Sequence, residues 1–413
     1  MKRTVWYISK YFSCPSVTSP GSRGFSLLEG MAKKNIQPIA IVSDSNNVAE
    51  VPELYKTVTH QELNGVKLVW LKTMRYGAAK SLSRVLSWFH FEWNLLFLNK
   101  KNIANPDVII VSSLSLLTIF NGLILKRKYK CKLVFEVRDI WPLSITEEGG
   151  FSNCNPFVML LAFAERLGYK YADAVVGTMP NLGEHVKQVL GYERTVDCIP
   201  MGAYEELFDP AHEPLPDCYV KKHLPLDKFL VVYSGTVGIT NNLDVFFQCA
   251  KKLESNSAIH FVVLGSGSLL DYYIDKYSAL SNLSFAPRVK KNQVLSVLQY
   301  ADLLYFSVYP SKVWDYGQSL NKVIDYMAAG KPIVASYSGH PSMIDEAGCG
   351  VFVPAGDIDL LAAEIVRFSE MPNNERIAMG SQGKTWLAEH RTYTKLADDY
   401  INILFPELIA KND

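Results

Sequence analysis

Short runs of apolar residues alternate with stretches of helical periodicity along almost the whole chain. In the first half, the runs of Val, Ile and Leu show no alternation with polar residues, which is typical of parallel strands buried on both faces. We expect strands at residues 5–8, 39–42, 66–71, 108–112, 133–137, 174–177 and 198–199. Because helical stretches separate most of these runs, the pattern predicts a doubly wound α/β domain.

A second series of the same kind follows. Its expected strands are residues 229–234, 259–264, 283–285, 303–308, 333–336 and 351–353. The region between the two series, 203–228, is rich in proline and acidic residues and weakly periodic, which is typical of a linker. The sequence therefore predicts two Rossmann-like domains facing a cleft, 1–202 and 229–384. The amphipathic stretch 385–413 is expected to pack back on the first domain.

Composition narrows the function classes. The 413 residues carry a net charge of +1, so no global charge points to nucleic acid. The seven cysteines form no CxxC pair, which fits a reducing compartment and gives no zinc site. No apolar run reaches the ~20 residues of a membrane span, and no signal pattern precedes the first strand. We expect a cytoplasmic protein with a membrane-facing surface.

Two glycine-rich turns follow strands of the second domain. YSGTVGITNNLD contains Gly235 and Thr236, and LGSGS contains Gly265. Glycine allows close approach of a ligand to the backbone, and a following helix N-terminus attracts phosphate. Such turns are also common without a ligand, so the motif alone leaves both readings open.

The stretch 309–336 is the most informative part of the chain. We expect a helix over 319–329 with Ser319 as its N-cap and an apolar face toward the core. Lys322 lies in the first turn, where its charge opposes the helix dipole, and a bound anion would remove that conflict. A solvated pair of Lys322 with Asp325 is the alternative.

Charged residues also end a strand of the first domain, in FEVRDIWPLS. Arg138 and Asp139 follow this buried strand, at the place where α/β enzymes hold reacting groups. An internal Arg–Asp salt bridge is the alternative. Gly21 and Arg23 directly precede a helix and form another candidate loop for an anion or an acceptor.

An aromatic segment, 78–102, distinguishes the first domain. It holds Trp88, Phe89, Phe91, Trp93 and Phe97, and its basic flanks are Lys80, Arg84, Lys100 and Lys101. Such a helix is able to lie in a membrane interface, while a helix buried in the domain core is the competing interpretation.

In order and spacing, FEVRDIWP, YSGT, LGSG, FAPR, SLNKVIDYMAAGKPIVAS and IDEAGCGVFVPAGD resemble glycosyltransferase family 4. RDIWP with NKVIDYMAAGKP is similar in particular to bacterial N-acetyl-L-fucosamine-type transferases of O-antigen and capsule assembly. The resemblance implies a GT-B fold and metal-independent, retaining transfer. Its expected donor, a UDP-linked N-acetylated deoxy-hexosamine, is a substrate, and no cofactor is expected. The implied acceptor is a glycan on a polyprenyl diphosphate, which would place the protein peripherally on the cytoplasmic face of the inner membrane.

The resemblance also assigns roles. Asp325 would bind the ribose, Lys322 and Arg288 would neutralise the diphosphate, and the Val289 backbone would meet the base. Further donor contacts are expected at Gly235, Thr236, Gly265, Ser319 and Asn321. Gly21 and Arg23 match an acceptor or phosphate loop. Arg138 and Asp139 match the strand end that faces the transferred sugar, so the expected catalytic set is Asp139, Arg138, Lys322 and Arg288.

One departure from the family pattern keeps alternatives open. Gly317 occupies the position of the first Glu of the E-x7-E motif, eight residues before Asp325. The change affects contacts to the donor sugar. Two other functions remain possible from the sequence. One is a GT-B nucleotide-sugar 2-epimerase, which would use the same donor cleft without a lipid; the other is a non-catalytic GT-B partner in a glycan-assembly complex, which the missing Glu suggests.

Overall fold

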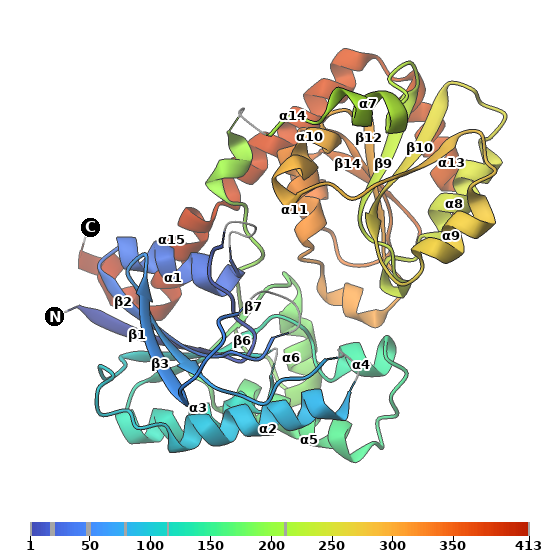
Figure 1. Cartoon of the computed structure of the whole chain (residues 1–413). Coiled ribbons are helices and arrows are strands. Elements are labelled where there is room, and N and C mark those ends of the chain that lie inside the picture. Colours follow the sequence, from blue (N-terminus) through green and yellow to red (C-terminus); the bar gives the residue numbers. More distant parts are fainter. Residues whose placement is uncertain are drawn as a thin grey trace. The chain divides into compact units, whose positions relative to one another are not determined.

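The computed structural model describes residues 2–16, 21–46, 51–77, 81–113, 115–209 and 213–411. The chain divides into two compact units, Met1–Pro200 with Tyr393–Asp413, and Met201–Thr392. Each unit has a mainly parallel sheet between layers of helices (Figure 1). The predicted architecture of two Rossmann-like α/β domains is confirmed.

The first unit contains an eight-stranded sheet in the order β3-β4-β2-β1-β5-β6-β7-β8. Its strands are β1 (Arg3–Ser9), β2 (Ile36–Ser43), β3 (Val58–Leu63), β4 (Val66–Leu71), β5 (Val108–Ser112), β6 (Lys132–Val137), β7 (Ala174–Gly177) and β8 (Asp197–Cys198). All neighbours pair in parallel except β3 and β4. The central strands are almost wholly buried, as their unalternated Val/Ile/Leu runs predicted.

Strand β3 was absent from the expected elements. None of its side chains is fully buried, so it lacks the apolar run that identified the other strands. A positive φ at Asn64 (51°) and at Gly65 (78°) forms the turn that joins it to β4. This Asn-Gly pair is the sequence signal that identifies the hairpin.

The helices of the first unit cover both faces of its sheet. They are α1 (Arg23–Lys33), α2 (Leu82–Phe97), α3 (Thr118–Tyr129), α4 (Leu143–Glu147), α5 (Pro156–Tyr171), α6 (Leu182–Leu190) and α15 (Tyr393–Leu404). Helices α1 and α15 pack together on one face, and α3 packs between α2 and α5 on the other (Figure 1). Gly30 permits the first contact, because a Cβ there would lie 2.5 Å from the Ala397 Cβ.

The second unit has a six-stranded parallel sheet in the order β11-β10-β9-β12-β13-β14. Its strands are β9 (Phe229–Thr236), β10 (Ile259–Ser266), β11 (Leu283–Ala286), β12 (Leu303–Ser307), β13 (Ile333–Ser336) and β14 (Gly350–Val353). One face is covered by α7 (Asp217–His223), α10 (Val294–Leu298), α11 (Asn321–Ala328), α12 (Met343–Ala347) and α14 (Asn373–His390). The other carries α8 (Asp244–Lys252), α9 (Leu270–Tyr277) and α13 (Ile358–Glu370).

Two boundaries differ from the expectation. The segment 203–228 belongs to the second unit: it holds α7 and a 3₁₀ helix, Glu205–Phe208, and it buries Leu224 in that unit's core. Its few apolar residues are widely spaced among prolines, which hid their packing role. The stretch 385–413 is likewise divided between the units. Helix α14 ends at His390 in the second unit, and α15, which begins at Tyr393, belongs to the first.

No helix in the described part of the chain is both long and apolar enough to cross a membrane.

Candidate functional site

The loop that follows β9 is folded back on its own strand. The Tyr233 hydroxyl donates to the Thr236 carbonyl oxygen (2.6 Å), and the Asn241 side-chain amide donates to the same oxygen (2.9 Å). Gly235 lies within this turn at φ 152°, where a side chain is strained. Hydrogen bonds between its own residues and the end of β9 therefore fix the conformation of this loop.

The neighbouring strand β10 packs against this loop without side chains in between. A Cβ on Gly265 would lie 1.9 Å from the Gly235 carbonyl oxygen, and one on Gly267 would lie 2.1 Å from the Val237 carbonyl oxygen. Both glycines are thus required by backbone packing. The LGSG motif therefore supports the loop after β9, and its direct contact with a ligand stays a prediction.

Strand β12 fixes the other side of the loop. The Ser307 hydroxyl donates to the Asn241 carbonyl oxygen (2.6 Å), and the Tyr309 amide donates to the Thr240 carbonyl oxygen (2.8 Å). In this sheet the chain reverses its direction of winding between β9 and β12. Doubly wound sheets bind ligands at such a switch point, beyond the carboxyl ends of the strands.

Helix α11 delivers Lys322 to this loop. Its ammonium group contacts the Asn241 side-chain oxygen, lies 3.3 Å from the Tyr233 hydroxyl, and is 4.9 Å from the Tyr233 ring centre. Burial lowers the pKa of Lys322 to about 8. Within the described ranges no carboxylate lies at ion-pair distance from it, so the alternative, a Lys322–Asp325 pair, is not formed. The site holds a partly buried cation among neutral groups.

The position of α11 is fixed by Tyr326. Its hydroxyl accepts from the Ser234 amide (2.8 Å) and donates to the Tyr305 carbonyl oxygen (3.0 Å), which ties the helix to β9 and β12. Asp325 precedes it on the helix, and burial raises the pKa of Asp325 to about 6 against the opposing charge of Lys291. Tyr233 and Tyr326 were not among the expected site residues, because a tyrosine in an apolar run is indistinguishable from a core residue.

The residues before α11 differ in detail from the expectation. The helix begins with Leu320 as its N-cap, and the Ser319 hydroxyl instead accepts from the Met201 amide (2.8 Å). Gly317 has φ 105°, a conformation that favours glycine. Next to it, Gln318 is 7% exposed, and neither amide atom has a hydrogen-bond partner in the described part of the chain. No sequence signal marked Gln318.

Among the residues that the structure describes, the side chains of the other expected donor contacts make no hydrogen bond or ion pair with the loop after β9 or with Lys322. Arg288 is exposed and follows β11, which is separated from β9 by β10. Val289 is half-buried and Asn321 is exposed in the first turn of α11. The structure brings Gly235, Thr236, Gly265 and Lys322 together, whereas the contribution of Arg288 stays a prediction.

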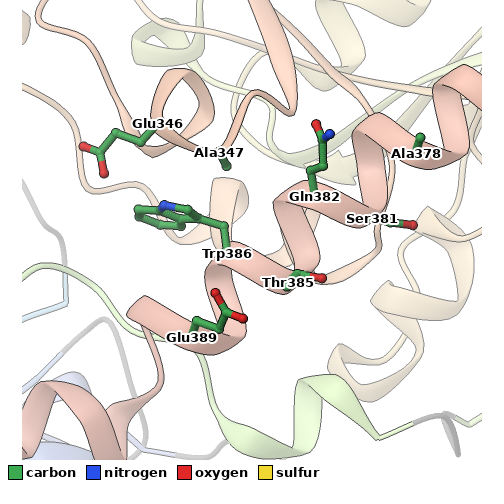
Figure 2. A pocket seen from close by; sticks show the side chains of 8 residues that line it. All are labelled: Glu346, Ala347, Ala378, Ser381, Gln382, Thr385, Trp386 and Glu389. Carbon is green, nitrogen blue, oxygen red and sulfur yellow. The ribbon is translucent and has the colours of Figure 1, made fainter.

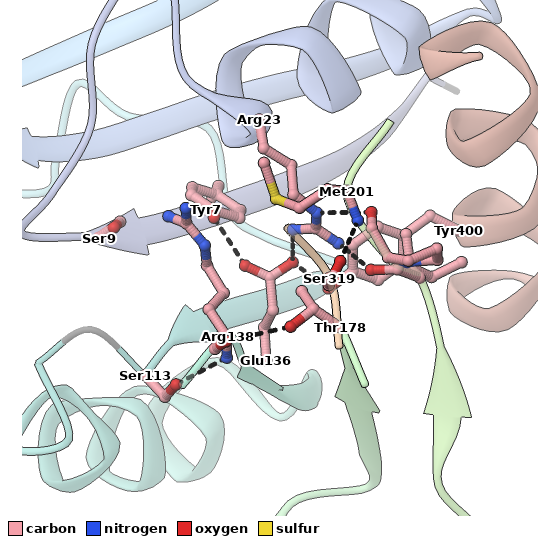
Figure 3. A network of polar contacts seen from close by, with 12 residues as sticks. Tyr7, Ser9, Arg23, Ser113, Glu136, Arg138, Thr178, Met201, Ser319 and Tyr400 are labelled. Carbon is pink, nitrogen blue, oxygen red and sulfur yellow. Dashed lines mark hydrogen bonds and ion pairs between the residues drawn. The ribbon is translucent and has the colours of Figure 1, made fainter. Parts of the chain in front are cut away.

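In the first unit, Arg23 has a structural role. Its guanidinium lies 2.7 Å from the Glu136 carboxylate, both side chains are completely buried, and Arg23 also donates to the Ile199 and Pro200 carbonyl oxygens (Figure 3). Tyr7 (2.7 Å) and Tyr400 (3.3 Å) donate to the same carboxylate. These contacts occupy the guanidinium, so the predicted binding of an acceptor or a phosphate by Arg23 is wrong.

Arg138 and Asp139 directly follow β6, at its carboxyl end. No ion pair joins their side chains in the described part of the chain, so the alternative of an internal Arg–Asp salt bridge is not formed. The Arg138 backbone is fixed by Ser113 and Thr178, and its side chain points toward β1 (Figure 3). Asp139 is exposed. Gly21 has φ 91° beside a loop whose residues 17–20 lie outside the described ranges. Lys80 of the aromatic segment also lies outside them.

A shallow pocket lies between α12 and α14 (Figure 2). Its lining includes Glu346, Gln382, Trp386 and Glu389 and none of the predicted site residues. In the described ranges no group of three or more His, Cys, Asp or Glu side chains is arranged to hold a metal ion.

Comparisons with known proteins agree with this architecture. Sucrose-phosphate synthase from Thermosynechococcus elongatus has a similar structure, with a TM-score of 0.70, 14% identity, and 99% of this chain and 100% of that chain covered. Anabaena HepE in complex with UDP-glucose has a TM-score of 0.63 and 14% identity, with 97% of this chain and 99% of that chain covered. An E. coli trehalose-6-phosphate synthase bound with UDP-2-fluoro glucose has a TM-score of 0.72 and 13% identity, with 97% of this chain and 98% of that chain covered.

At these identities the structural similarity establishes the fold alone. No curated protein sequence matches the chain. Residues 219–386 match the family model described as Glycosyl transferases group 1. This range contains the β9 loop, Gly265, Lys322 and Asp325. The chain thus has two Rossmann-like units of the GT-B fold, and the range that matches the glycosyl transferases group 1 model lies within the second unit.

Proposed function

We propose that this protein transfers a sugar from a UDP-sugar to a lipid-linked glycan, with retention of anomeric configuration. One observation carries the proposal: Lys322 is partly buried beside the β9 loop at the switch point of the sheet, with no carboxylate to balance its charge in the described ranges. A diphosphate would supply that balance, and the first turn of α11 offers unpaired amides to it. Solved structures of the same fold hold UDP-glucose or its fluoro analogue.

The chemistry expected of this site is stabilisation of the leaving group. As the bond from the sugar C1 to the β-phosphate oxygen breaks, its electron pair stays on that oxygen. Lys322 and the α11 amides stabilise the growing charge, and such preorganised groups contribute several kcal/mol. The acceptor hydroxyl forms its bond to C1 on the face that the phosphate leaves, and Asp139 is our candidate to receive the hydroxyl proton. Metal independence belongs to the proposal, and activity in EDTA tests it.

The donor sugar and acceptor follow from the resemblance to O-antigen and capsule transferases. We propose an N-acetylated deoxy-hexosamine as the sugar and a polyprenyl diphosphate glycan as the acceptor. With Gly317 in place of a carboxylate, the unpartnered Gln318 amide is a candidate for the sugar contact. Exposed aromatic side chains on α2 favour a lipid-linked acceptor over the soluble substrate of a 2-epimerase.

A panel of UDP- and GDP-sugars tests the donor assignment. Ligand at about 100 times its Kd stabilises the folded state by about 2.7 kcal/mol, which raises Tm by roughly 5–10 °C in a unit of this size. We expect UDP-sugars, and among them N-acetylated ones, to give this shift in thermal unfolding. If no nucleotide sugar raises Tm, the proposed function fails and a scaffold role is favoured; conversion of a UDP-sugar to its epimer without an acceptor would instead support the epimerase.

A further inference from the structure

Helix α2 has two apolar faces. Trp88, Phe91 and Leu95 are at most 1% exposed and pack into the first unit. On the opposite side, the side chains of Leu82, Leu86, Phe89, Trp93 and Phe97 are 84, 55, 47, 62 and 65% exposed. Their spacing of three or four residues places them in one stripe along the helix. A large stripe of this kind is unusual on a monomeric protein and marks an interaction surface.

The apolar surface continues onto the neighbouring helices. Helix α3 packs against both α2 and α5 on the same side of the sheet (Figure 1). It exposes Ile124, and α5 exposes Met159 and Phe163, each by about half (47, 59 and 56%). The rings of Phe120 and Phe163 lie 6.3 Å apart and join the two helices. We call the outer side of α2, α3 and α5 the three-helix face.

The three-helix face exposes no carboxylate of its own helices. Their two acidic residues point inward: Glu92 accepts from Thr118 (2.6 Å) and Asn121 (2.7 Å), and Glu165 lies 2.7 Å from His185. Exposed cations lie on these helices and just beyond their ends, namely Lys101, Arg127, Lys128, Lys130, Arg166 and Lys170. Lys126 is paired with Asp173 (2.7 Å).

Two of the basic residues expected to flank the aromatic segment have other roles. The Lys100 ammonium is buried and donates to the Leu95 and Leu98 carbonyl oxygens at the end of α2. Arg84 donates to the Tyr11 hydroxyl (2.9 Å). Most of the exposed positive charge therefore comes from α3 and α5, which the sequence did not connect with the aromatic segment.

We propose that the three-helix face docks the first unit on an anionic lipid bilayer. Exposed aromatic and aliphatic side chains enter the interface, and the cations meet lipid phosphates. A second copy of the chain is a poorer occupant, because a two-fold contact would set these cations against one another. The docking deepens the proposed function, on which it rests, since it would bring the protein to the membrane that holds a lipid-linked acceptor. It is measurable without the reaction.

Co-sedimentation with vesicles of phosphatidylcholine, with or without phosphatidylglycerol, tests the docking. We expect binding to the anionic vesicles, a drop of at least about tenfold in Trp93→Ala/Phe97→Ala, and roughly fivefold for each cation removed in Arg127→Gln/Lys128→Gln. Tyr272→Ala and Leu360→Ala, at half-exposed sites of α9 and α13, are matched controls that should bind as wild type.

Absence of binding, equal binding to both vesicle types, or unchanged binding of Trp93→Ala/Phe97→Ala would overturn the docking. So would a dimer that this double variant separates while no vesicles bind. The Tm shift with UDP-sugars should persist in every variant of the face. If vesicles bind but no nucleotide sugar shifts Tm, the docking stands and the proposed function fails.

Discussion

Lys322→Ala should reduce kcat/KM for sugar transfer by roughly 100- to 1,000-fold, the usual cost of removing one charge-stabilising group from an active site. The ammonium is held beside the Tyr233 hydroxyl and the Asn241 side chain, and no carboxylate of the described residues lies at ion-pair distance from it. Initial rates with a UDP-sugar and a lipid-linked glycan measure the effect. Retention of near wild-type turnover would show that Lys322 does not contact the diphosphate.

Lys322→Met separates this loss from unfolding. Burial lowers the pKa of Lys322 to about 8, so the folded protein holds the proton less tightly than the unfolded chain does. Below pH 8 the buried charge therefore costs stability, and this cost falls as pH rises from about 8 toward the ordinary lysine value. A methionine of similar length removes it. We expect Lys322→Met to unfold at or above the wild-type Tm at pH 7, while its transfer activity is lost.

The second large effect concerns stability. Arg23→Met leaves the Glu136 carboxylate buried without its ion partner, and breaking such a pair typically costs 3–5 kcal/mol. For a unit of this size, that loss lowers Tm by roughly 10 °C. Burial alone would raise the pKa of Glu136, but Arg23 and Arg138 hold it below its ordinary value, so the carboxylate stays charged. Thermal unfolding followed by circular dichroism measures the change.

A double variant and a surface pair serve as controls. Arg23→Met/Glu136→Leu removes both charges and should recover much of the lost Tm, because an apolar pair no longer leaves a charge uncompensated. Lys187→Ala breaks the exposed pair with Glu193 and should leave Tm unchanged. If Arg23→Met unfolds at the wild-type temperature, the ion pair does not stabilise the first unit.

The sequence was sufficient for the two sheets apart from β3, because most of their other strands are Val/Ile/Leu-rich runs, a pattern typical of strands buried on both faces. The sequence was insufficient to predict the role of Arg23 as the ion partner of Glu136. An arginine after a glycine at a helix start has the same local pattern whether it binds a substrate or a buried carboxylate. Only the fold brings Glu136, more than a hundred residues away, to within 2.7 Å.

The second-unit site was predictable in part for the same reason. The glycines at 235 and 265 and the misplaced charge of Lys322 are local signals, and the structure brings them together at the switch point. The contacts of Lys322 with Tyr233 and Asn241 depend on how α11 lies across β9, which no local pattern encodes. The three-helix face was hidden likewise, because only the fold brings α2, α3 and α5, which are far apart in the sequence, into contact with one another.

The uptake of a proton on donor binding tests most directly whether a diphosphate meets Lys322. In the free protein the pKa of Lys322 is about 8, and a diphosphate beside it would raise that pKa. The phosphates of a UDP-sugar do not titrate near this pH. Titration calorimetry at pH 8 in two buffers of different ionisation enthalpy should show uptake of about half a proton per UDP-sugar, absent in Lys322→Met. Donor binding without proton uptake, or equal uptake by Lys322→Met, would contradict the account.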